Sequence, residues 1–231
     1  MSGNKVEQHP HGGDWLREIV FGLNDGLVTT LVFVLAVSAV AQKQLVVVAV
    51  GELLAGAVSM GLGAFLSART EYAILAQRIA TERFEIAHEP AEEHAELRRI
   101  YYRKGFRGPL LEGVVRFLTA NNHRWLNAMV QDELGVVEGE AQRPPWLQGL
   151  LVAASFALGA FIPIVPLLIG ISSPQVAAYL LTVLTAFLLG MLKARFTLAG
   201  ALRNSVEILV IITIGAGIGL LVGAVLRLVA T

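Results

Sequence analysis

Six glutamates and two histidines are concentrated in residues 81–96, TERFEIAHEPAEEHAE. On a helix, side chains three or four positions apart are neighbours, and like charges at that spacing repel. Glu82/Glu85 and Glu93/Glu96 are such pairs, without the Lys or Arg that a solvated helix usually places four residues after a glutamate. An acidic solvated face is the ordinary interpretation, but the accumulated repulsion indicates an absent counter-ion. A metal cation is the simplest candidate.

Two further acids, Asp25 and Glu52, lie inside long apolar stretches. A carboxylate in hydrocarbon is energetically costly and usually marks a cavity or an ion path. The alternatives are that Asn24-Asp25-Gly26 forms a turn outside the membrane, and that Glu52 lies near the far membrane interface. Met60 follows Glu52 by eight residues, about two helical turns, so their side chains point the same way. Ordinary packing is the alternative for this methionine.

Met129 and Glu133 form a third set, spaced i, i+4 in a later polar segment. Taken alone, this pair says little. Carboxylates suit hard divalent cations, whereas a thioether favours softer ones. A site that mixes glutamate with methionine therefore favours a borderline transition metal such as Fe(II) over Mg(II) or Ca(II). The residues by themselves predict a membrane protein that handles a divalent metal.

The composition of the 231-residue chain also indicates a membrane protein, because 55% of it is hydrophobic and its mean hydropathy is +0.64. Eighteen basic residues balance eighteen acidic ones, so net charge indicates no partner. No basic tract suggests nucleic-acid binding. Cysteine is absent, which excludes thiolate sites and disulfides. The polar N-terminal tail lacks the basic-then-apolar order of a signal peptide.

A spanning helix needs about 20 mostly apolar residues, and five segments meet this length. They are residues 19–41, 45–68, 147–170, 175–192 and 206–226. The predicted fold is therefore an all-α membrane protein of five transmembrane helices, with a cytoplasmic helical metal-binding domain inserted between spans two and three. The predicted divisions are a tail (1–14), helices one and two (15–68), the inserted domain (69–143) and helices three to five (144–231).

The distribution of Lys and Arg predicts the orientation, because cytoplasmic loops are enriched in both. With the N-terminus inside, the cytoplasmic side holds Lys5, Arg17, eleven basic residues between spans two and three, Lys193, Arg195 and Arg203. The opposite side holds only Lys43 and Arg227. The N-terminus and the inserted domain are therefore expected to be cytoplasmic.

The second span shows no break at its cytoplasmic end. From residue 45 to about His88 there is no proline or turn cluster, so one helix about 65 Å long is expected. Pro90 suits the first turn of the next helix and Gly105 its C-terminal end. Two further helices are expected from about residue 108 to 121 and from 123 to 134.

Five strings resemble, in order, motifs of the vacuolar iron transporter family: VFGLNDGLVTTLVFV, GELLAGAVSMGLGAFLSARTE, WLNAMVQDELGV, GAFIPIVPLLIG and KARFTLAGALRNSVE. The resemblance covers nearly the whole chain after residue 14. It implies a five-span dimer that exports Fe(II) from the cytosol, into a vacuole or out of the cell, in exchange for protons. It also implies a pore along the dimer interface and a cytoplasmic domain that collects metal.

The resemblance assigns roles to individual residues. Asp25 and Glu52 correspond to the family's two membrane carboxylates and Met60 to its pore methionine. The cytoplasmic metal residues would be Glu82, Glu85, Glu93, Glu96, Met129 and Glu133. The resemblance assigns no role to His88, Glu89, Glu92 and His94. They either support the acidic group or are additions particular to this chain. The segment between residues 96 and 129 follows the family pattern least closely.

We therefore predict a transporter, not an enzyme, that exports Fe(II) and also Mn(II) by exchange with protons. Fe(II) is its substrate and no cofactor is permanently bound; Co(II) or Zn(II) are possible substitutes. The expected partners are the lipid bilayer, protons and a second copy of the chain, with no nucleic acid. The expected location is the cell membrane in a prokaryote and the vacuolar membrane in a eukaryote.

Two alternatives come from other classes of protein. A membrane-anchored ferroxidase or storage protein would use Glu-x-x-His motifs, two copies of which occur in di-iron bundles. The chain has one such spacing, Glu85–His88, and lacks the second. A helical membrane scaffold that transports no ion is the other alternative, which metal uptake into proteoliposomes would exclude.

Overall fold

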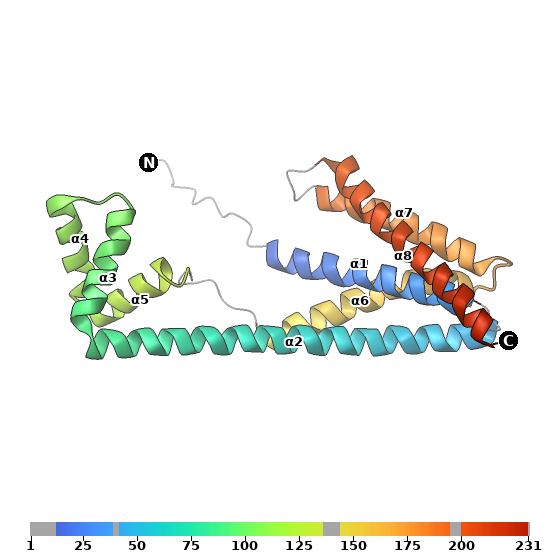
Figure 1. The fold of residues 1–231 in the computed structure, drawn as a ribbon, viewed down its shortest axis with the longest axis horizontal. Helices are drawn as coiled ribbons and strands as arrows, with labels where there is room; N and C mark the ends of the chain where they lie inside the picture. Colours follow the sequence, from blue (N-terminus) through green and yellow to red (C-terminus); the bar gives the residue numbers. More distant parts are fainter. Residues whose placement is uncertain (1–12, 39–41, 136–143, 195–199, 231) are drawn as a thin grey trace, which may run out of the picture. The chain divides into compact units, whose positions relative to one another are not determined.

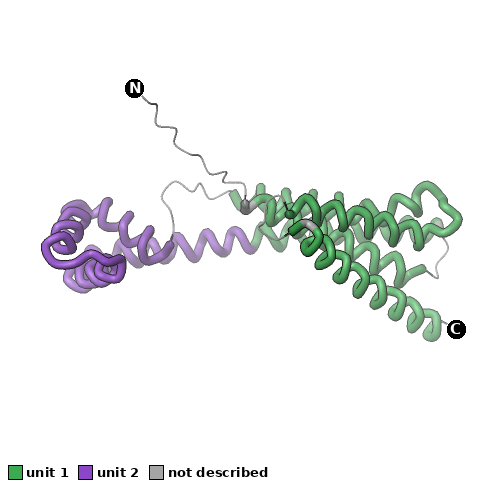
Figure 2. Tube along the Cα trace, turned by 90° about the horizontal axis from the view of Figure 1, so that it is seen from above, with its two compact units in different colours: residues 1–66, 144–231 green, residues 67–143 purple. Residues whose placement is uncertain are grey.

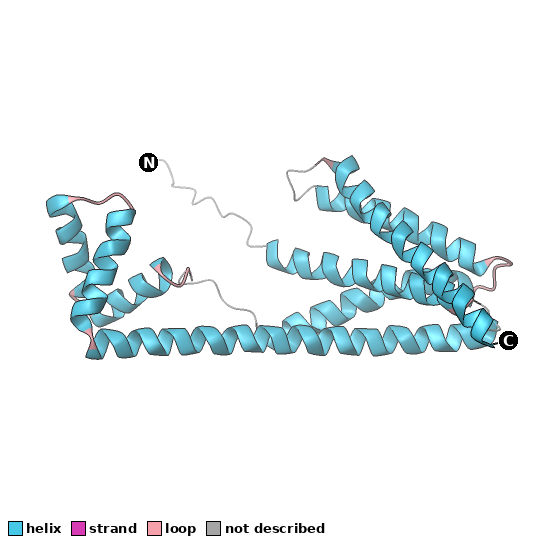
Figure 3. Ribbon diagram, viewed as in Figure 1, coloured by secondary structure: helices cyan, strands magenta, loops and turns pink. Residues whose placement is uncertain are grey.

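The structure is a computed structural model that describes residues 13–38, 42–135, 144–194 and 200–230, and in these ranges it contains helices and turns only (Figure 3). The helices are α1 (Gly13–Ala36), α2 (Gln42–His88), α3 (Pro90–Arg103), α4 (Gly108–Thr119), α5 (Asn122–Asp132), α6 (Pro145–Leu168), α7 (Pro174–Ala194) and α8 (Ala201–Ala230) (Figure 1). Five of them, α1, α2, α6, α7 and α8, are long and apolar enough to cross a membrane. The described residues therefore confirm the all-α class, and they contain five candidate spans, as the sequence predicts.

The chain divides into two compact units (Figure 2). Residues 1–66 and 144–231 form the membrane unit, and residues 67–143 form the acidic unit. The 47-residue helix α2 contributes to both. About 20 residues suffice to cross a bilayer, and α2 becomes charged from Arg69 onward. The charged part of α2, which bears Glu82 and Glu85, is therefore not needed to cross the hydrocarbon.

Glycines allow the helices of the membrane unit to approach one another closely. A Cβ added to Gly26 of α1 would lie 2.2 Å from the backbone oxygen of Phe156 in α6, and one on Gly159 would lie 2.2 Å from that of Leu23. On α8, a Cβ at Gly219 would lie 2.7 Å from the backbone oxygen of Val32. Small residues at such contacts let helix backbones pack tightly in lipid.

Helix α1 continues through Asn24-Asp25-Gly26, so the turn considered as an alternative for this tripeptide does not form. The reason is tertiary, because Gly26 is where α1 and α6 meet backbone to backbone. The helix ends at Ala36, earlier than the predicted limit of residue 41. Residues 39–41 of the predicted span lie outside the described residues.

The acidic unit packs α3, α4 and α5 with the end of α2. Its buried core consists of Ile86, Leu97, Ile100, Leu111, Val115, Trp125, Ala128 and Met129. Pro90 begins α3 as predicted, and Gly105 follows its end with φ +103, a conformation that favours glycine. The side chain of Asn121 caps α5 by accepting from the backbone N–H of His123 at 2.9 Å. This helix ends at Asp132, two residues before its predicted end.

Candidate metal site

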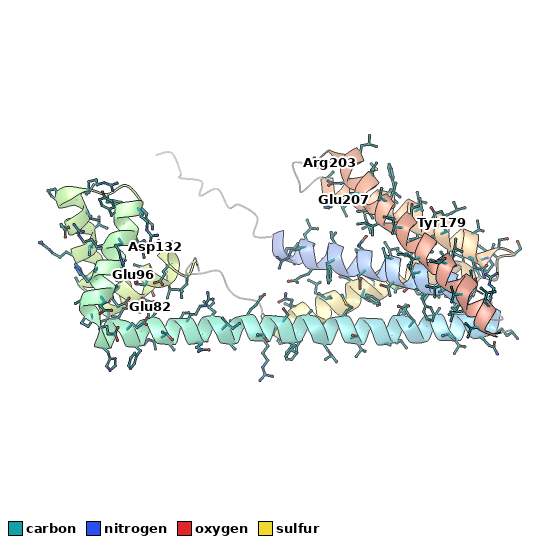
Figure 4. All side chains as sticks on the ribbon, viewed as in Figure 1. Glu82, Glu96, Asp132, Tyr179, Arg203 and Glu207 are labelled. Atoms are coloured by element: carbon teal, nitrogen blue, oxygen red, sulfur yellow. The ribbon has the colours of Figure 1, made fainter. Side chains whose placement is uncertain are left out.

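Three helices bring acidic side chains together in the acidic unit (Figure 4). Five carboxylates form a group in which each interacts with at least two of the others. They are Glu82 and Glu85 near the end of α2, Glu93 and Glu96 on α3, and Glu133 at the C-terminal cap of α5. The first four were predicted from one continuous stretch of sequence. The fifth comes from a helix some forty residues later, so the fold assembles the group.

Glu82 and Glu93 form the buried pair of this group, with 5% and 7% of their surfaces exposed. Their carboxyl groups share a hydrogen bond, which requires a proton between them. Burial chiefly, then this hydrogen bond and the surrounding carboxylates, raises the pKa of Glu82 to about 8. Burial also raises the pKa of Glu93, although accepting from Glu82 opposes that rise. The two carboxyl groups therefore share one proton as a pair.

The second oxygen of Glu82 is a potential ligand. Oε1 is buried and has no hydrogen-bond partner among the described residues. A buried polar atom without a partner is costly, so such atoms are rare in folded proteins. A bound cation would satisfy this oxygen and replace the proton, because a carboxylate must be deprotonated to bind metal.

Glu96 and Glu133 line a cavity of about 440 Å³ between α3 and α5. Burial, followed by the nearby charges of Glu96 and Glu85, raises the pKa of Glu133. Glu96 also makes an ion pair of 3.6 Å with Arg99. The wall of the same cavity carries both signs of charge, because it also includes Arg103, Lys104 and Asp132.

Asp132 has a structural role that the sequence did not indicate. It forms an ion pair with Lys104, the C-cap residue of α3, and accepts a hydrogen bond from the hydroxyl of Tyr101 on α3. Burial, this hydrogen bond and the negative charge of Asp132 raise the pKa of Tyr101 to about 12. These contacts hold the end of α5 against α3 and place Glu133 beside the other carboxylates.

Met129 lies in the apolar core of the acidic unit and is wholly buried there. The same buried core includes Leu97, Ile100 and Trp125. In this arrangement the thioether contributes to packing, and the carboxylates make up the charged group.

The five carboxylates are not arranged as a preformed metal site. In the ranges that the structure describes, no three His, Cys, Asp or Glu side chains converge closely enough to hold a metal ion. The structure therefore contains a buried pair of carboxyl groups with three further acids around it. Their side chains would have to move before they share one cation.

The histidine of the single Glu-x-x-His spacing, His88, contacts Phe84. Nδ1 of His88 lies 2.9 Å from the backbone oxygen of Phe84, and the two rings stack with centroids 3.9 Å apart. This ring is therefore engaged with its own helix. Glu89 occupies the N-cap position of α3 without a capping hydrogen bond from its side chain.

The membrane unit brings two of its three predicted residues into electrostatic range. Glu52 on α2 interacts with Asp25 on α1 and accepts a hydrogen bond of 2.7 Å from the hydroxyl of Thr30. Next to Asp25, Oδ1 of Asn24 is buried without a partner among the described residues. Met60 is partly buried two turns along α2 from Glu52. Sequence reasoning missed Thr30, because its partner is 22 residues away and no local motif marks it.

Known proteins resemble this chain over most of its length. A sequence model described as the VIT family matches residues 16–224. Vacuolar iron transporter 1 of Arabidopsis thaliana is 31% identical over 207 residues, which are 87% of this chain and 82% of the relative. Vacuolar iron transporter 2 of Oryza sativa subsp. japonica is 32% identical over 197 residues, covering 83% and 79%. The vacuolar iron transporter of Plasmodium berghei (strain Anka) is 28% identical over 204 residues, covering 83% and 75%.

These relatives are named as transporters, which confirms the prediction that the chain is not an enzyme. The family match also confirms the resemblance inferred from the sequence motifs. Because the match spans most of the chain and the relatives align over most of their own length, this chain belongs to the VIT family.

Proposed function

We propose that the chain transports Fe(II), and also Mn(II), out of the cytosol across a membrane in exchange for protons. The names of its relatives support iron as the substrate. The observation that carries the exchange mechanism is the buried Glu82–Glu93 pair, which shares one proton and leaves Oε1 of Glu82 without a partner.

The same oxygens can hold either a proton or a metal ion, and this competition is the basis of exchange. Burial favours the neutral, protonated acid, whereas a nearby cation favours the carboxylate. Metal entry would therefore release the proton and draw Glu85, Glu96 and Glu133 toward the pair. Co(II) and Zn(II) would substitute, since carboxylate sites bind a range of divalent metals.

The direction of transport is inferred from charge. Lys and Arg gather on the side where the acidic unit lies, which supports a cytoplasmic position for this unit. Metal collected there would pass to Met60, Glu52 and Asp25 in the membrane unit. The location would be the cell membrane in a prokaryote or the vacuolar membrane in a eukaryote.

A homodimer would complete the path. On α2, the small residues Gly51, Ala55, Ser59 and Gly63 recur every four positions and are exposed. A Cβ added to Gly51 or Gly63 would meet nothing within 4 Å. Small residues at this spacing are typical of helix pairing in membranes, so we propose that α2 meets a second copy of the chain here.

Calorimetry on the full chain in detergent tests the acidic site. We expect Glu82→Ala with Glu93→Ala to weaken Mn(II) or Co(II) binding about tenfold or more, since removing a metal ligand or its support typically has an effect of this size. Adding Glu85→Ala and Glu96→Ala should abolish binding. The matched control is Glu112→Ala, whose exposed carboxylate pairs with Arg98 at 2.8 Å outside the group. Undiminished binding by the quadruple variant would contradict the proposal.

A further inference from the structure

The hydroxyl of Thr30 connects α1 to the carboxylate of Glu52 on α2. Its Oγ1 donates to Oε2 of Glu52 over 2.7 Å. The side chain of Thr30 is wholly buried, so water does not compete for this proton. The bond therefore holds one oxygen of Glu52 at a fixed point on α1.

Other threonines of the chain use their hydroxyls differently. Thr182, Thr185 and Thr213 each donate to the carbonyl four residues earlier in their own helix, at 2.8, 2.9 and 2.8 Å. This local bond is the usual choice for a threonine inside a helix. A hydroxyl has one proton to donate. By donating to Glu52, Thr30 gives up the local bond and orients a side chain on another helix.

We propose that Thr30 is a positioning residue for transport, which fixes Glu52 so that Oε1 meets the passing ion while Oε2 is held. The proposal rests on the proposed role of Glu52 in the ion path. A glutamate side chain has several rotatable bonds and explores many rotamers when it is not held. Loss of the bond would leave Glu52 in place but reduce the fraction of time that it is correctly oriented.

Three variants separate positioning from packing. Thr30→Val keeps the shape of the side chain and removes the hydroxyl, whereas Thr30→Ser keeps the hydroxyl. Thr182→Val is the matched control, because Thr182 is equally buried but its hydroxyl bonds within α7. Each variant is made in the full-length chain and reconstituted in proteoliposomes. Its initial rate of Fe(II) flux is compared with that of the wild type.

An infrared measurement tests the contact without reference to transport. The carboxyl band of Glu52 is identified by its loss in Glu52→Gln, and its frequency reports the hydrogen bond that the group accepts. We expect this band to shift in Thr30→Val and to stay in place in Thr30→Ser and Thr182→Val.

We expect Thr30→Val to slow Fe(II) flux about tenfold, as for loss of a hydrogen bond to a charged group, with near wild-type flux in the other two variants. An unshifted band in Thr30→Val, or a shifted band with wild-type flux, would overturn the proposal. Wild-type flux in Glu52→Gln would instead contradict the proposed ion path. The infrared band would still show whether Thr30 donates to Glu52 in that case. Failure of the Thr30 proposal can therefore be distinguished from failure of the proposed ion path.

Discussion

At the scale of single residues, Glu82 makes the stability of the acidic unit depend on pH. Its pKa is about 8 in the folded chain against an ordinary value of 4.5, so the folded state binds the proton more tightly. The stabilisation is complete below about pH 4.5 and is lost as the pH rises through about 8. Without metal, the unit should therefore become less stable between these values.

Hydrogen exchange of residues 82–100 in the full-length, metal-free protein measures this dependence. We expect the exchange protection of these amides to fall from pH 5.5 to pH 8.5 after correction for intrinsic rates. Glu82→Gln should flatten the trend, because its amide donates to Glu93 at every pH. Protection that rises with pH in the wild type would show that Glu82 does not bind a proton more tightly in the folded state.

The sequence predicted the members of the acidic group better than their individual roles. Like-charge spacing marked Glu82, Glu85, Glu93 and Glu96, because that signal is local in a helix. How tightly the Glu82–Glu93 pair holds its proton depends on burial and on the charge of Glu133, both of which arise only on folding. The sequence also could not predict that Met129 is buried among apolar residues. Its i, i+4 spacing from Glu133 is compatible with a metal ligand and with a core residue.

At the scale of helices, the contact between α1 and α6 depends on Gly26. An added Cβ would lie 2.2 Å from one backbone atom of α6 and 2.7 Å from another, and neither can move alone. We expect Gly26→Ala to destabilise the membrane unit by about 1–3 kcal/mol through overpacking. The matched control is Gly217→Ala on α8, where a Cβ meets nothing within 4 Å. That change should be neutral or stabilise by up to about 1 kcal/mol.

Thermal unfolding in detergent compares the two variants. Equal melting temperatures for Gly26→Ala and Gly217→Ala would show that the close approach of α1 and α6 does not hold in solution. This contact also explains why Asn24-Asp25-Gly26 was ambiguous from the sequence. Its composition is typical of a turn, and only the packing of Gly26 against α6 requires a helix there.

At the scale of the whole molecule, the proposed dimer can be tested by cross-linking. The chain has no cysteine, so a single introduced thiol is unique. Ser59→Cys on the exposed small-residue face of α2 should form a disulfide-linked dimer under mild oxidation in membranes. Leu184→Cys, exposed on α7, is the control and should remain monomeric. Efficient cross-linking at Leu184 and none at Ser59 would place the second copy elsewhere.

The five candidate spans could be predicted from hydropathy, because every helix that crosses a bilayer needs about 20 mostly apolar residues. The orientation, the dimer and the direction of transport depend on interactions beyond one chain, and they remain predictions.

Fe(II) flux in proteoliposomes with and without an imposed pH gradient tests the central claim most directly. Metal–proton exchange predicts that flux is accelerated when protons are more concentrated on the side that receives the metal. In Asp25→Asn and Glu52→Gln, which preserve side-chain volume, flux should fall close to background while metal binding by the acidic unit is unchanged. An Fe(II) flux that does not change with the pH gradient would contradict metal–proton exchange. Wild-type flux in both variants would contradict passage through these two carboxylates.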